Sequence, residues 1–346
     1  MKPHMRDIRY ALRMLGRSKG FTLAAVLCLA LGIGATSAIF TVVNAVVLRP
    51  LPYEQPDRLA RLYTEFPTFP NGGLRRFWTS APEFLDLRRE LKSYQSVDAW
   101  ATGGVNVGGG AEPARVSATQ VSGGLLPTLG VNPLHGRLLT AQDDLPESPA
   151  VAVISHGLWQ RVFGGDRSLL SREIRVNGVP TTVVGIMPEG FQFPPGEVDP
   201  PEVWTTLRIN PAIPGNRGGH YLYLLGRLRD GVSHGQAQQE LQQIVNAHHE
   251  RDVPGVHDFN RQHHTLLTYP LHDEVVGNVR PAMLMMLAAV VFVLLIACGN
   301  VANLLLARAE GRQREISIRT AMGAHTGALV RQFLWEGVVL SLAGAA

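Results

Sequence analysis

Six histidines gather in one short stretch of the chain and are the residues best suited to bind a metal. They are His248, His249, His257, His263, His264 and His272. Imidazole nitrogens bind zinc and copper. The stretch contains two adjacent pairs, however, and adjacent residues on a helix or a strand point in different directions, which is poor geometry for holding one ion. The spacing therefore favours a solvated, irregular segment, and we expect neither a metal site nor a cofactor.

Motifs for nucleotide binding are missing from the sequence. The glycine-rich run 103–110, GGVNVGGG, lacks the Gly-Lys-Ser/Thr ending that cradles phosphates, and we expect it to form a flexible hairpin. We also expect the serines and histidines to form no nucleophile elbow, and no HExxH motif occurs. The sequence therefore predicts no catalytic residues. If the protein uses ATP, a partner chain must hydrolyse it.

Two long segments, residues 21–48 and 281–307, contain no Asp, Glu, Lys or Arg. A bilayer core of ~30 Å is crossed by about 20 helical residues, so both segments are long enough to span a membrane. We expect the spans at 21–48 and 282–306. The first apolar run exceeds the ~7–15 residues typical of a signal peptide, so cleavage is not expected. A third run, 328–346, is expected to be a truncated third span.

Basic residues lie beside the apolar segments. Residues 1–20 carry six Lys or Arg against one Asp, and residues 308–327 carry four Arg against two Glu. Positive charge beside a span marks the cytoplasmic side, so residues 49–281 are expected outside the membrane and 307–327 inside. Residues 1–20 are expected to form a basic amphipathic helix at the inner interface. The net charge of +4 thus indicates membrane orientation rather than nucleic-acid binding.

Three small residues recur at every fourth position of the first span: Ala30, Gly34 and Ala38. Small residues at this spacing let two helices approach closely in lipid. We therefore expect this stripe to pack against another helix.

Residues 49–281 alternate between β-prone and helical patterns. Strands are expected at 58–63, 115–121, 151–154, 174–176, 181–186 and 221–228. Ser80, Ser155 and Ser233 are expected to cap helices. The stretch 188–220 is rich in Pro and Gly and is expected to be a long, partly ordered excursion. The pattern predicts an α+β domain in two lobes.

The loop after the second span, residues 307–324, reads ARAEGRQREISIRTAMGA. Ile316, Ile318 and Met322 give this polar segment an apolar edge. A short amphipathic helix of this kind can dock into a groove on a cytosolic partner. It can equally be a basic loop that only sets topology. The spacing leaves both interpretations open.

This loop resembles the coupling segment of FtsX-type ABC transporter permeases, on the residues REISIRTAMGA at Arg314–Ala324 and the apolar run from Val330. The exported region resembles the MacB-like periplasmic core domain. That resemblance rests, in order, on LGV at 129–131, GRLL at 136–139, VAVISHGLW at 151–159, VVGIMPEGF at 183–191 and GRLRDGV at 226–232. Thr320 departs from the family, which commonly has a basic residue there. The chain is most similar to the large duplicated permeases that lack a fused ATPase.

The resemblance implies a membrane protein with helical spans and a large α+β domain outside, built as a porter-like α/β lobe with an inserted β-rich lobe at about 101–220. It implies an inner-membrane, multi-pass permease subunit that transmits ATP-driven motion from a separate cytosolic ABC ATPase to a periplasmic domain. The result would be efflux or export, or mechanical activation of a periplasmic partner. A second permease half is the implied membrane partner. The implied ATPase-coupling residues are Arg314, Glu315, Ile316, Ile318, Arg319, Met322, Gly323 and Ala324.

Two other classes of protein fit parts of the pattern. A membrane-bound receptor with an extracytoplasmic sensing domain would need a cytoplasmic signalling module after a span, where the sequence has a short loop and another apolar run. A membrane-tethered exported enzyme would need a convergent set of catalytic residues. The permease interpretation is the one that accounts for the whole sequence.

Overall fold

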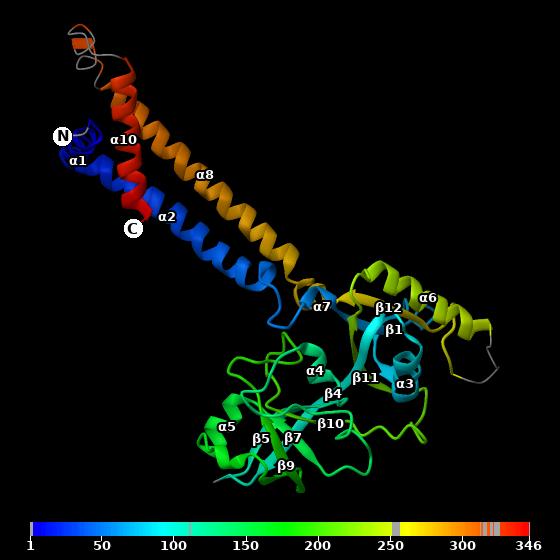
Figure 1. Cartoon of the computed structure of the whole chain (residues 1–346). Helices are drawn as coiled ribbons and strands as arrows, with labels where there is room; N and C mark the ends of the chain where they lie inside the picture. The colour runs from blue at the N-terminus through cyan, green and yellow to red at the C-terminus, as the bar shows by residue number, and fades with distance from the viewer. Residues whose placement is uncertain are drawn as a thin grey trace. The chain divides into compact units, whose positions relative to one another are not determined.

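The computed structural model describes residues 3–110, 112–250, 257–311, 313, 317–318, 321 and 326–345 (Figure 1). The chain divides into two compact units. The helical unit comprises Met1–Arg49 and Asn278–Ala346, and the sheet unit comprises Pro50–Gly277.

The helical unit contains α1 (Pro3–Arg17), α2 (Lys19–Val43), α8 (Arg280–Glu310) and α10 (Thr326–Ala345). The helix α2 continues into a π-helical turn, Asn44–Leu48. Among the described residues, Lys19–Leu48 and Arg280–Glu310 are long and apolar enough to cross a membrane. The third expected span is represented by a shorter apolar helix, Leu334–Ala345, inside α10.

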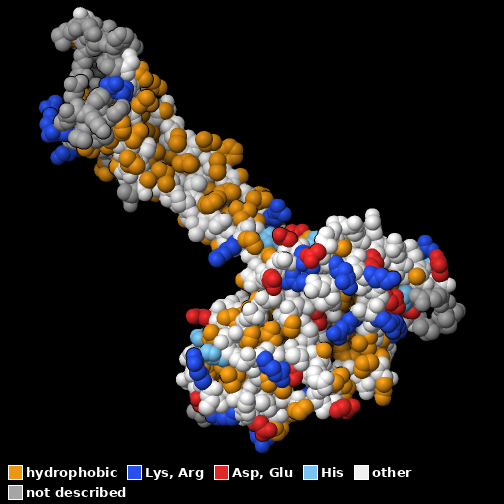
Figure 2. Space-filling view, in the orientation of Figure 1, with side chains coloured by type: hydrophobic (Ala, Val, Ile, Leu, Met, Phe, Trp, Pro, Cys, Tyr) orange, Lys and Arg blue, Asp and Glu red, His pale blue; other side chains and the backbone are white. Residues whose placement is uncertain are grey.

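Apolar side chains cover the outside of α2 and α8 as well as their contact (Figure 2). Leu31 is 72% exposed and Ile296 is 63% exposed, as expected for helices whose solvent is lipid. The buried contact joins Leu15, Ala25, Leu29, Val301 and Leu340. These helices therefore have an apolar surface all round rather than one apolar stripe.

The stripe that packs α2 against α8 is not the one expected from the sequence. Gly32 is buried, and a Cβ at this position would lie 3.0 Å from the Ala297 Cβ. Thr36 Oγ1 lies 3.3 Å from the Val290 carbonyl oxygen and donates to the Gly32 carbonyl oxygen at 2.7 Å. The close approach therefore runs along a face that contains Gly32 and Thr36 rather than through the expected stripe.

The expected stripe faces elsewhere because its positions are rotated around the helix from Gly32. Gly34 and Ala38 are exposed, and nothing described lies within 4 Å of a Cβ at Gly34. Ala30 is half-buried beside α10, where a Cβ at Gly344 would lie 3.3 Å from the Ala30 nitrogen. Packing of this stripe against another helix therefore stays a prediction.

Within the described residues of the sheet unit, one mixed sheet has 12 strands, nine of which follow the order β12-β1-β11-β4-β5-β10-β7-β9-β6. The other three lie off this path: β2 pairs with β1, β3 with β11, and β8 with β4 and β9. The strands are β1 (Leu59–Phe66), β2 (Leu74–Phe77), β3 (Thr79–Ser80), β4 (Tyr94–Gly108), β5 (Ala114–Val121), β6 (His135–Gly136), β7 (Val151–Ile154), β8 (Glu173–Val176), β9 (Val179–Ile186), β10 (Val203–Thr206), β11 (His220–Leu228) and β12 (Thr265–Pro270). The pairs β5–β10 and β7–β9 are parallel and the other pairs are antiparallel.

Helices complete the sheet unit. They are α3 (Ala81–Glu90), α4 (Leu125–Leu129), α5 (His156–Phe163), α6 (His234–Glu250) and α7 (Leu271–Val276), with short 3-10 turns at Pro56–Arg58 and Arg167–Leu169. Figure 1 shows α3 and α6 beside the β12-β1-β11 half of the sheet and α5 beside the β7-β9 half. The strand β4 is hydrogen-bonded to both β11 and β5, so it belongs to both halves.

Three apolar clusters hold these layers together. One joins Phe84 and Leu87 of α3 and Leu241 of α6 to the sheet. A second surrounds Trp100 and Trp204, and a third packs α5 on β7 and β9. Each fully buried Leu or Phe side chain contributes roughly 1.5–3 kcal/mol. The unit therefore has a large apolar core.

Local sequence signals explain several element boundaries. Ser80 and Glu83 form a capping box at the start of α3, and the Ser155 hydroxyl accepts a hydrogen bond from the Leu158 amide at 3.0 Å in α5. Asn177 and Gly178 both have positive φ and turn the chain between β8 and β9, as their types favour.

The expectation of a flexible hairpin in the glycine-rich run was wrong for its first part. Residues 103–107 lie in β4 and pair with β5, and Gly108 pairs with Arg175 of β8. Hydrogen bonding to neighbouring strands here overrides the weak strand preference of Gly. The stretch 188–220 contains β10, whose Val203 and Trp204 are fully buried between β5 and β7, so part of the expected excursion is ordered.

The first and last long strands of the sheet unit, β1 and β12, are neighbours in the sheet. Ala60, near the start of β1, pairs with Pro270 at the end of β12. The following helix α7 is tied to β1, because the Tyr63 hydroxyl donates to Glu274 Oε2 at 2.7 Å. The incoming and outgoing chain segments therefore meet at one end of the same strand pair.

Candidate functional site

The expected coupling loop falls mostly outside the described residues. This applies to Arg314, Glu315, Ile316, Arg319, Met322, Gly323 and Ala324. Ile318 is described, has helical backbone geometry and is 60% exposed. The coupling role of these residues stays a prediction.

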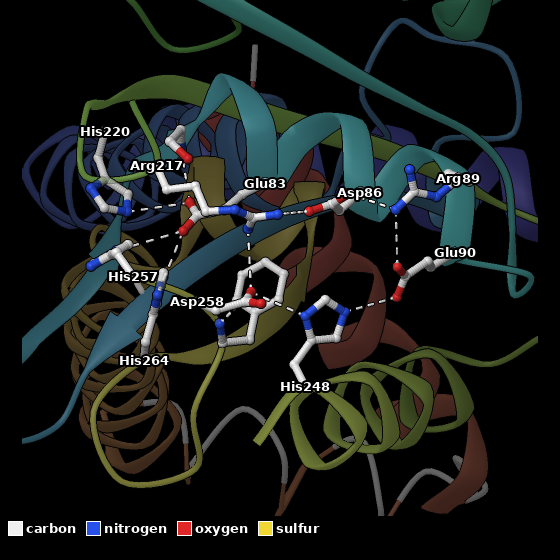
Figure 3. A network of polar contacts seen from close by, with 12 residues as sticks. Glu83, Asp86, Arg89, Glu90, Arg217, His220, His248, His257, Asp258 and His264 are labelled. Atoms are coloured by element: carbon white, nitrogen blue, oxygen red, sulfur yellow. Dashed lines mark hydrogen bonds and ion pairs between the residues drawn. The ribbon is translucent and has the colours of Figure 1, made fainter. Parts of the chain in front are cut away.

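The sheet unit brings four chemically active side chains together: Glu83, His220, His257 and His264. We call them the histidine–glutamate cluster (Figure 3). One ligand atom from each residue lies within 4.8 Å of the corresponding atom of every other. Glu83 lies in the first turn of α3, His220 begins β11, and the other two lie between α6 and β12.

The distances centre on the Glu83 carboxylate. His220 Nε2 lies 3.2 Å from Glu83 Oε2, and His257 Nε2 and His264 Nδ1 each lie 3.6 Å from Glu83 Oε1. The side chains of Glu83, His220 and His264 are 0%, 6% and 2% exposed, whereas that of His257 is 40% exposed. Three of the four side chains are thus buried, and the cluster reaches solvent at His257.

Aromatic rings enclose the cluster. The Phe66 ring stacks on His264 with centroids 4.4 Å apart and meets His220 edge-on at 5.2 Å. Phe77 lies 5.9 Å from the His220 ring and Phe259 lies 5.2 Å from the His264 ring. These side chains exclude water and fix the imidazole planes.

Burial shifts the acidities of the cluster. It lowers the pKa of His264 to about 4, because the imidazolium form loses hydration, although the Glu83 charge acts in the opposite direction. Burial also lowers the pKa of His257. Burial alone would raise the pKa of Glu83, but the His220 and His264 imidazoles and the Ser80 amide hold it below its ordinary value. The cluster therefore favours an ionised Glu83 and neutral His257 and His264.

A second network of charges borders the cluster. Arg217 pairs with Asp86, and its Nη1 lies 3.2 Å from Asp258 Oδ1. His248 Nδ1 lies 3.0 Å from that same oxygen, and its Nε2 lies 3.0 Å from Glu90 Oε2. In this network each described carboxylate pairs with an arginine, whereas the described ion-pair contacts of Glu83 are with histidines alone, as Figure 3 shows.

Sequence reasoning expected the histidines of 248–272 to lie in a solvated, irregular segment. That was wrong for His248, which is buried on α6, and for His264, which is buried between the Phe66 and Phe259 rings. His263 does remain exposed, with Nδ1 2.9 Å from Thr68 Oγ1. Two members of the cluster, Glu83 and His220, lie outside the histidine-rich stretch and were missed, because only the sheet brings them near it.

One serine has the GxSxG spacing of a nucleophile elbow, within Gly231–Gly235. Ser233 precedes α6, accepts a hydrogen bond from the Gln236 amide at 3.3 Å and donates to Gln236 Oε1 at 3.0 Å. Its φ is not positive, whereas an elbow holds the serine in a strained turn. Ser233 therefore begins a helix, as expected, and the spacing is no sign of a nucleophile.

The comparisons with known proteins match the two parts of the chain to two family models. Residues 22–244, more than half of the chain, match the MacB-like periplasmic core domain. Residues 287–346 match the FtsX-like permease C-terminal model.

The names of curated relatives combine ATP binding with a permease. The chain is 29% identical over 208 residues to the macrolide export ATP-binding/permease protein MacB of Burkholderia lata, covering 59% of this chain and 28% of that protein. It is 26% identical to the MacB of Bdellovibrio bacteriovorus (61% and 32%) and 26% identical to the pyoverdine export ATP-binding/permease protein PvdT of Pseudomonas syringae pv. syringae (59% and 30%). The chain thus spans about three tenths of the length of these relatives.

Two solved structures are similar to the sheet unit at low sequence identity. A domain of a permease protein from Porphyromonas gingivalis has a TM-score of 0.48 at 16% identity, covering 64% of this chain and 92% of that chain. The periplasmic region of MacB from Actinobacillus actinomycetemcomitans has a TM-score of 0.45 at 14% identity, with coverages of 64% and 92%.

A large mixed α/β domain between two apolar helices, the second of which begins the permease match, defines a class of membrane protein. The family match then specifies it. The chain belongs to the family of permeases with a MacB-like periplasmic core domain.

Proposed function

We propose that the chain is the permease part of an ABC exporter, in which the sheet unit is the periplasmic domain and ATP is hydrolysed by a separate cytosolic chain. The observation that carries this proposal is the order of parts in one chain. The MacB-like match, residues 22–244, begins in the first span-length apolar helix, and the FtsX-like match, residues 287–346, begins in the second. In this proposal a domain outside the membrane is covalently connected to a segment that faces an ATPase.

The proposed topology follows from the charges. The basic residues of 1–20 and 308–327 stay in the cytoplasm, α2 and α8 cross the inner membrane, and residues 50–277 lie in the periplasm. In this proposal α10 contributes a third span. The sheet unit is then a porter-like lobe around α3 and α6, with an inserted lobe at about 101–220.

The proposed partners are a cytosolic ABC ATPase and a second permease half. The ATPase would bind the coupling loop 312–324. The exposed Gly34 and Ala38 stripe of α2 supports the second partner, because small residues left uncovered within this unit suit close packing against another helix in lipid. Such packing would leave Gly32 free for its contact with α8.

The experiment is reconstitution of the full-length permease in lipid nanodiscs with the ATPase encoded beside it. The proposal predicts that the permease alone hydrolyses no ATP above background, and that the pair forms a stable complex with stimulated turnover. A catalytically dead ATPase is the control for contaminating activity. Robust hydrolysis by the permease alone, or no complex with any ABC ATPase of the same genome, would contradict the proposal. Binding of a signalling kinase or cyclase instead would favour the receptor alternative.

A further inference from the structure

We propose that Glu83, His220, His257 and His264 form a structural binding site for one first-row divalent transition metal, with Zn²⁺ the best fit. The inference goes beyond transport and does not depend on it. It rests on the donor set, on the spacing of the donor atoms and on buried polar atoms that have no other described partner.

The donor set suits zinc. Three imidazole nitrogens and one carboxylate oxygen are borderline ligands, which bind Zn²⁺, Cu²⁺ or Ni²⁺ in preference to Ca²⁺ or Mg²⁺. In a tetrahedral zinc site with bonds of ~2.0–2.1 Å, neighbouring ligand atoms are about 3.3 Å apart. His257 Nε2 and His264 Nδ1 each lie 3.6 Å from Glu83 Oε1, and His220 Nε2 lies 3.2 Å from Oε2. With one ligand atom taken from each residue, the four atoms lie within 4.8 Å of one another. An ion could therefore be held with small side-chain movements.

Buried polar atoms point at the place where the ion would lie. Among the described residues, Glu83 Oε1, His220 Nε2 and His264 Nδ1 are buried without a hydrogen-bond partner. No Lys or Arg of the described chain forms an ion pair with Glu83 either. A buried carboxylate without a cation is costly, typically by several kcal/mol. A divalent cation would satisfy all three atoms at once.

The contacts around the cluster orient the donors. His220 Nδ1 lies 3.1 Å from the Gly218 carbonyl oxygen and donates to it, which leaves Nε2 directed toward Glu83. The Ser80 amide donates to Glu83 Oε2 at 2.9 Å. Such bonds from ligands to the backbone are typical of metal sites.

Four protein ligands indicate a structural rather than a catalytic site, because a catalytic zinc keeps one position open for water or substrate. The ion would join the start of α3, the start of β11 and the segment before β12, which are distant in sequence. His257, which is 40% exposed, marks the route by which an ion enters. The expected effect is a gain in stability of the sheet unit on binding.

The test uses the untagged full chain in detergent, stripped with EDTA and dialysed. Metal analysis after incubation with Zn²⁺ should give one ion per chain. Titration with Co²⁺ should produce the visible absorption bands of tetrahedral coordination, and Zn²⁺ should displace Co²⁺ and raise the temperature of thermal unfolding by several degrees. Absence of a stoichiometric ion, with unfolding unchanged by Zn²⁺, would overturn the proposal and leave a protonated histidine as the partner of Glu83.

Variants locate the ion. His264→Gln and His257→Gln should each weaken Zn²⁺ binding by about 100-fold or more, since even second-shell changes cost 10–100-fold. His257 is partly exposed, so its variant is expected to fold even if His264→Gln does not. His263→Gln, the matched control one residue from His264, should bind as wild type, because His263 contacts Thr68 instead. Unchanged binding by His257→Gln and His264→Gln would refute the assignment.

Discussion

Arg308 of α8 and Glu336 of α10 form an ion pair inside the helical unit, with Nη1 3.8 Å from Oε2. Glu336 is fully buried and the Arg308 side chain is 11% exposed. The same guanidinium donates to the Met14 carbonyl oxygen at 2.8 Å and lies 4.6 Å from the centre of the Phe21 ring. One arginine thus connects α8 to α1, α2 and α10.

Glu336→Gln should therefore loosen the helical unit. Breaking a well-formed buried pair costs 3–5 kcal/mol, and at 3.8 Å we expect roughly 1–3 kcal/mol. The measurement is thermal unfolding of the full chain in detergent, followed by circular dichroism. Glu310→Gln, which changes an exposed carboxylate of α8, is the control and should have no effect. Equal stability of both variants would show that the pair contributes nothing.

The pair Arg137 and Asp143 predicts a pH dependence of the sheet unit. Two guanidinium nitrogens donate to the two carboxylate oxygens at 2.7 and 2.9 Å, and Thr140 adds bonds from its amide and hydroxyl. The Arg137 bonds, with those of Thr140, lower the pKa of Asp143 to about 2, although partial burial acts against them. A lowered carboxyl pKa stabilises the fold above the unfolded value of ~3.9, and this contribution is lost as the pH falls toward about 2.

Asp143→Asn should accordingly lower the free energy of unfolding at pH 7 by about 1–2 kcal/mol, a range reduced because half of Arg137 is exposed. The difference from wild type should shrink as the pH is lowered from about 4 to about 2. Urea unfolding across this range measures it. Glu147→Gln, at an exposed site of the same loop, should not change the profile. A difference that does not depend on pH would contradict the assignment.

Gly226 of β11 is predicted to have no room for a side chain. A Cβ there would lie 2.3 and 2.5 Å from two ring carbons of Tyr94, whose hydroxyl is held by Thr268 at 2.9 Å. Overpacking of this kind costs typically 1–3 kcal/mol. Gly226→Ala should therefore lower the midpoint of urea unfolding.

Gly103→Ala is the matched control for Gly226→Ala. It also lies in the sheet, but nothing described lies within 4 Å of its Cβ position. It should leave stability unchanged or slightly raised, since Ala restricts the unfolded chain more than Gly. Equal loss in both variants would show that strand glycines matter for another reason than space.

The coupling loop is tested by Ile316→Asp in the full-length permease. A carboxylate buried in an apolar groove costs several kcal/mol, enough to separate a modest interface from the ATPase. We expect insertion into the membrane to continue while co-purification with the ATPase and stimulated turnover are lost. On an ideal helix Ile318 points roughly 200° away from Ile316, so Ile318→Asp is expected to weaken the complex less than Ile316→Asp. If Ile316→Asp retains the complex, the loop only sets topology.

The topology is tested by reporter fusions. A phosphatase that is active only in the periplasm should be active after Gly110, in the sheet unit, and inactive after Gly311, at the end of α8. A fluorescent protein that folds only in the cytoplasm should give the opposite result. Activity of one reporter at both sites would mean that α8 does not cross the membrane.

Strongly patterned elements could be predicted from the sequence. Val151–Ile154 is a strand with the expected bounds, and Ser80, Ser155 and Ser233 begin helices. These features depend on neighbouring residues, so the sequence contains the signal. The strand formed by Gly103–Gly108 could not be predicted, because its hydrogen bonds come from β5 and β8, at positions that sequence periodicity does not reveal.

The histidine–glutamate cluster was beyond sequence reasoning for the same kind of reason. In the sequence, Glu83 is accounted for by the capping box that it forms with Ser80, so nothing there points to its contacts with the three histidines. His220 stands alone, 37 positions before His257 in the numbering. The sequence shows His263 and His264 as an adjacent pair and does not distinguish them. In the fold the His264 side chain is buried and the His263 side chain is exposed to solvent, so only His264 belongs to the cluster.

The pairing of Ala60 with Pro270 has a mechanical consequence. The two tethers of the sheet unit attach to the same end of one antiparallel strand pair. If the tethers move together, the load passes along β1 and β12 and the sheet is carried as one rigid body. If they separate sideways, the load falls on one hydrogen-bonded residue pair at a time, starting with Ala60 and Pro270. The hydrogen bond between Tyr63 and Glu274 is then the first side-chain contact to break. The sheet unit therefore resists a force that moves both tethers in the same direction. A force that moves the tethers apart separates β1 from β12 one residue pair after another.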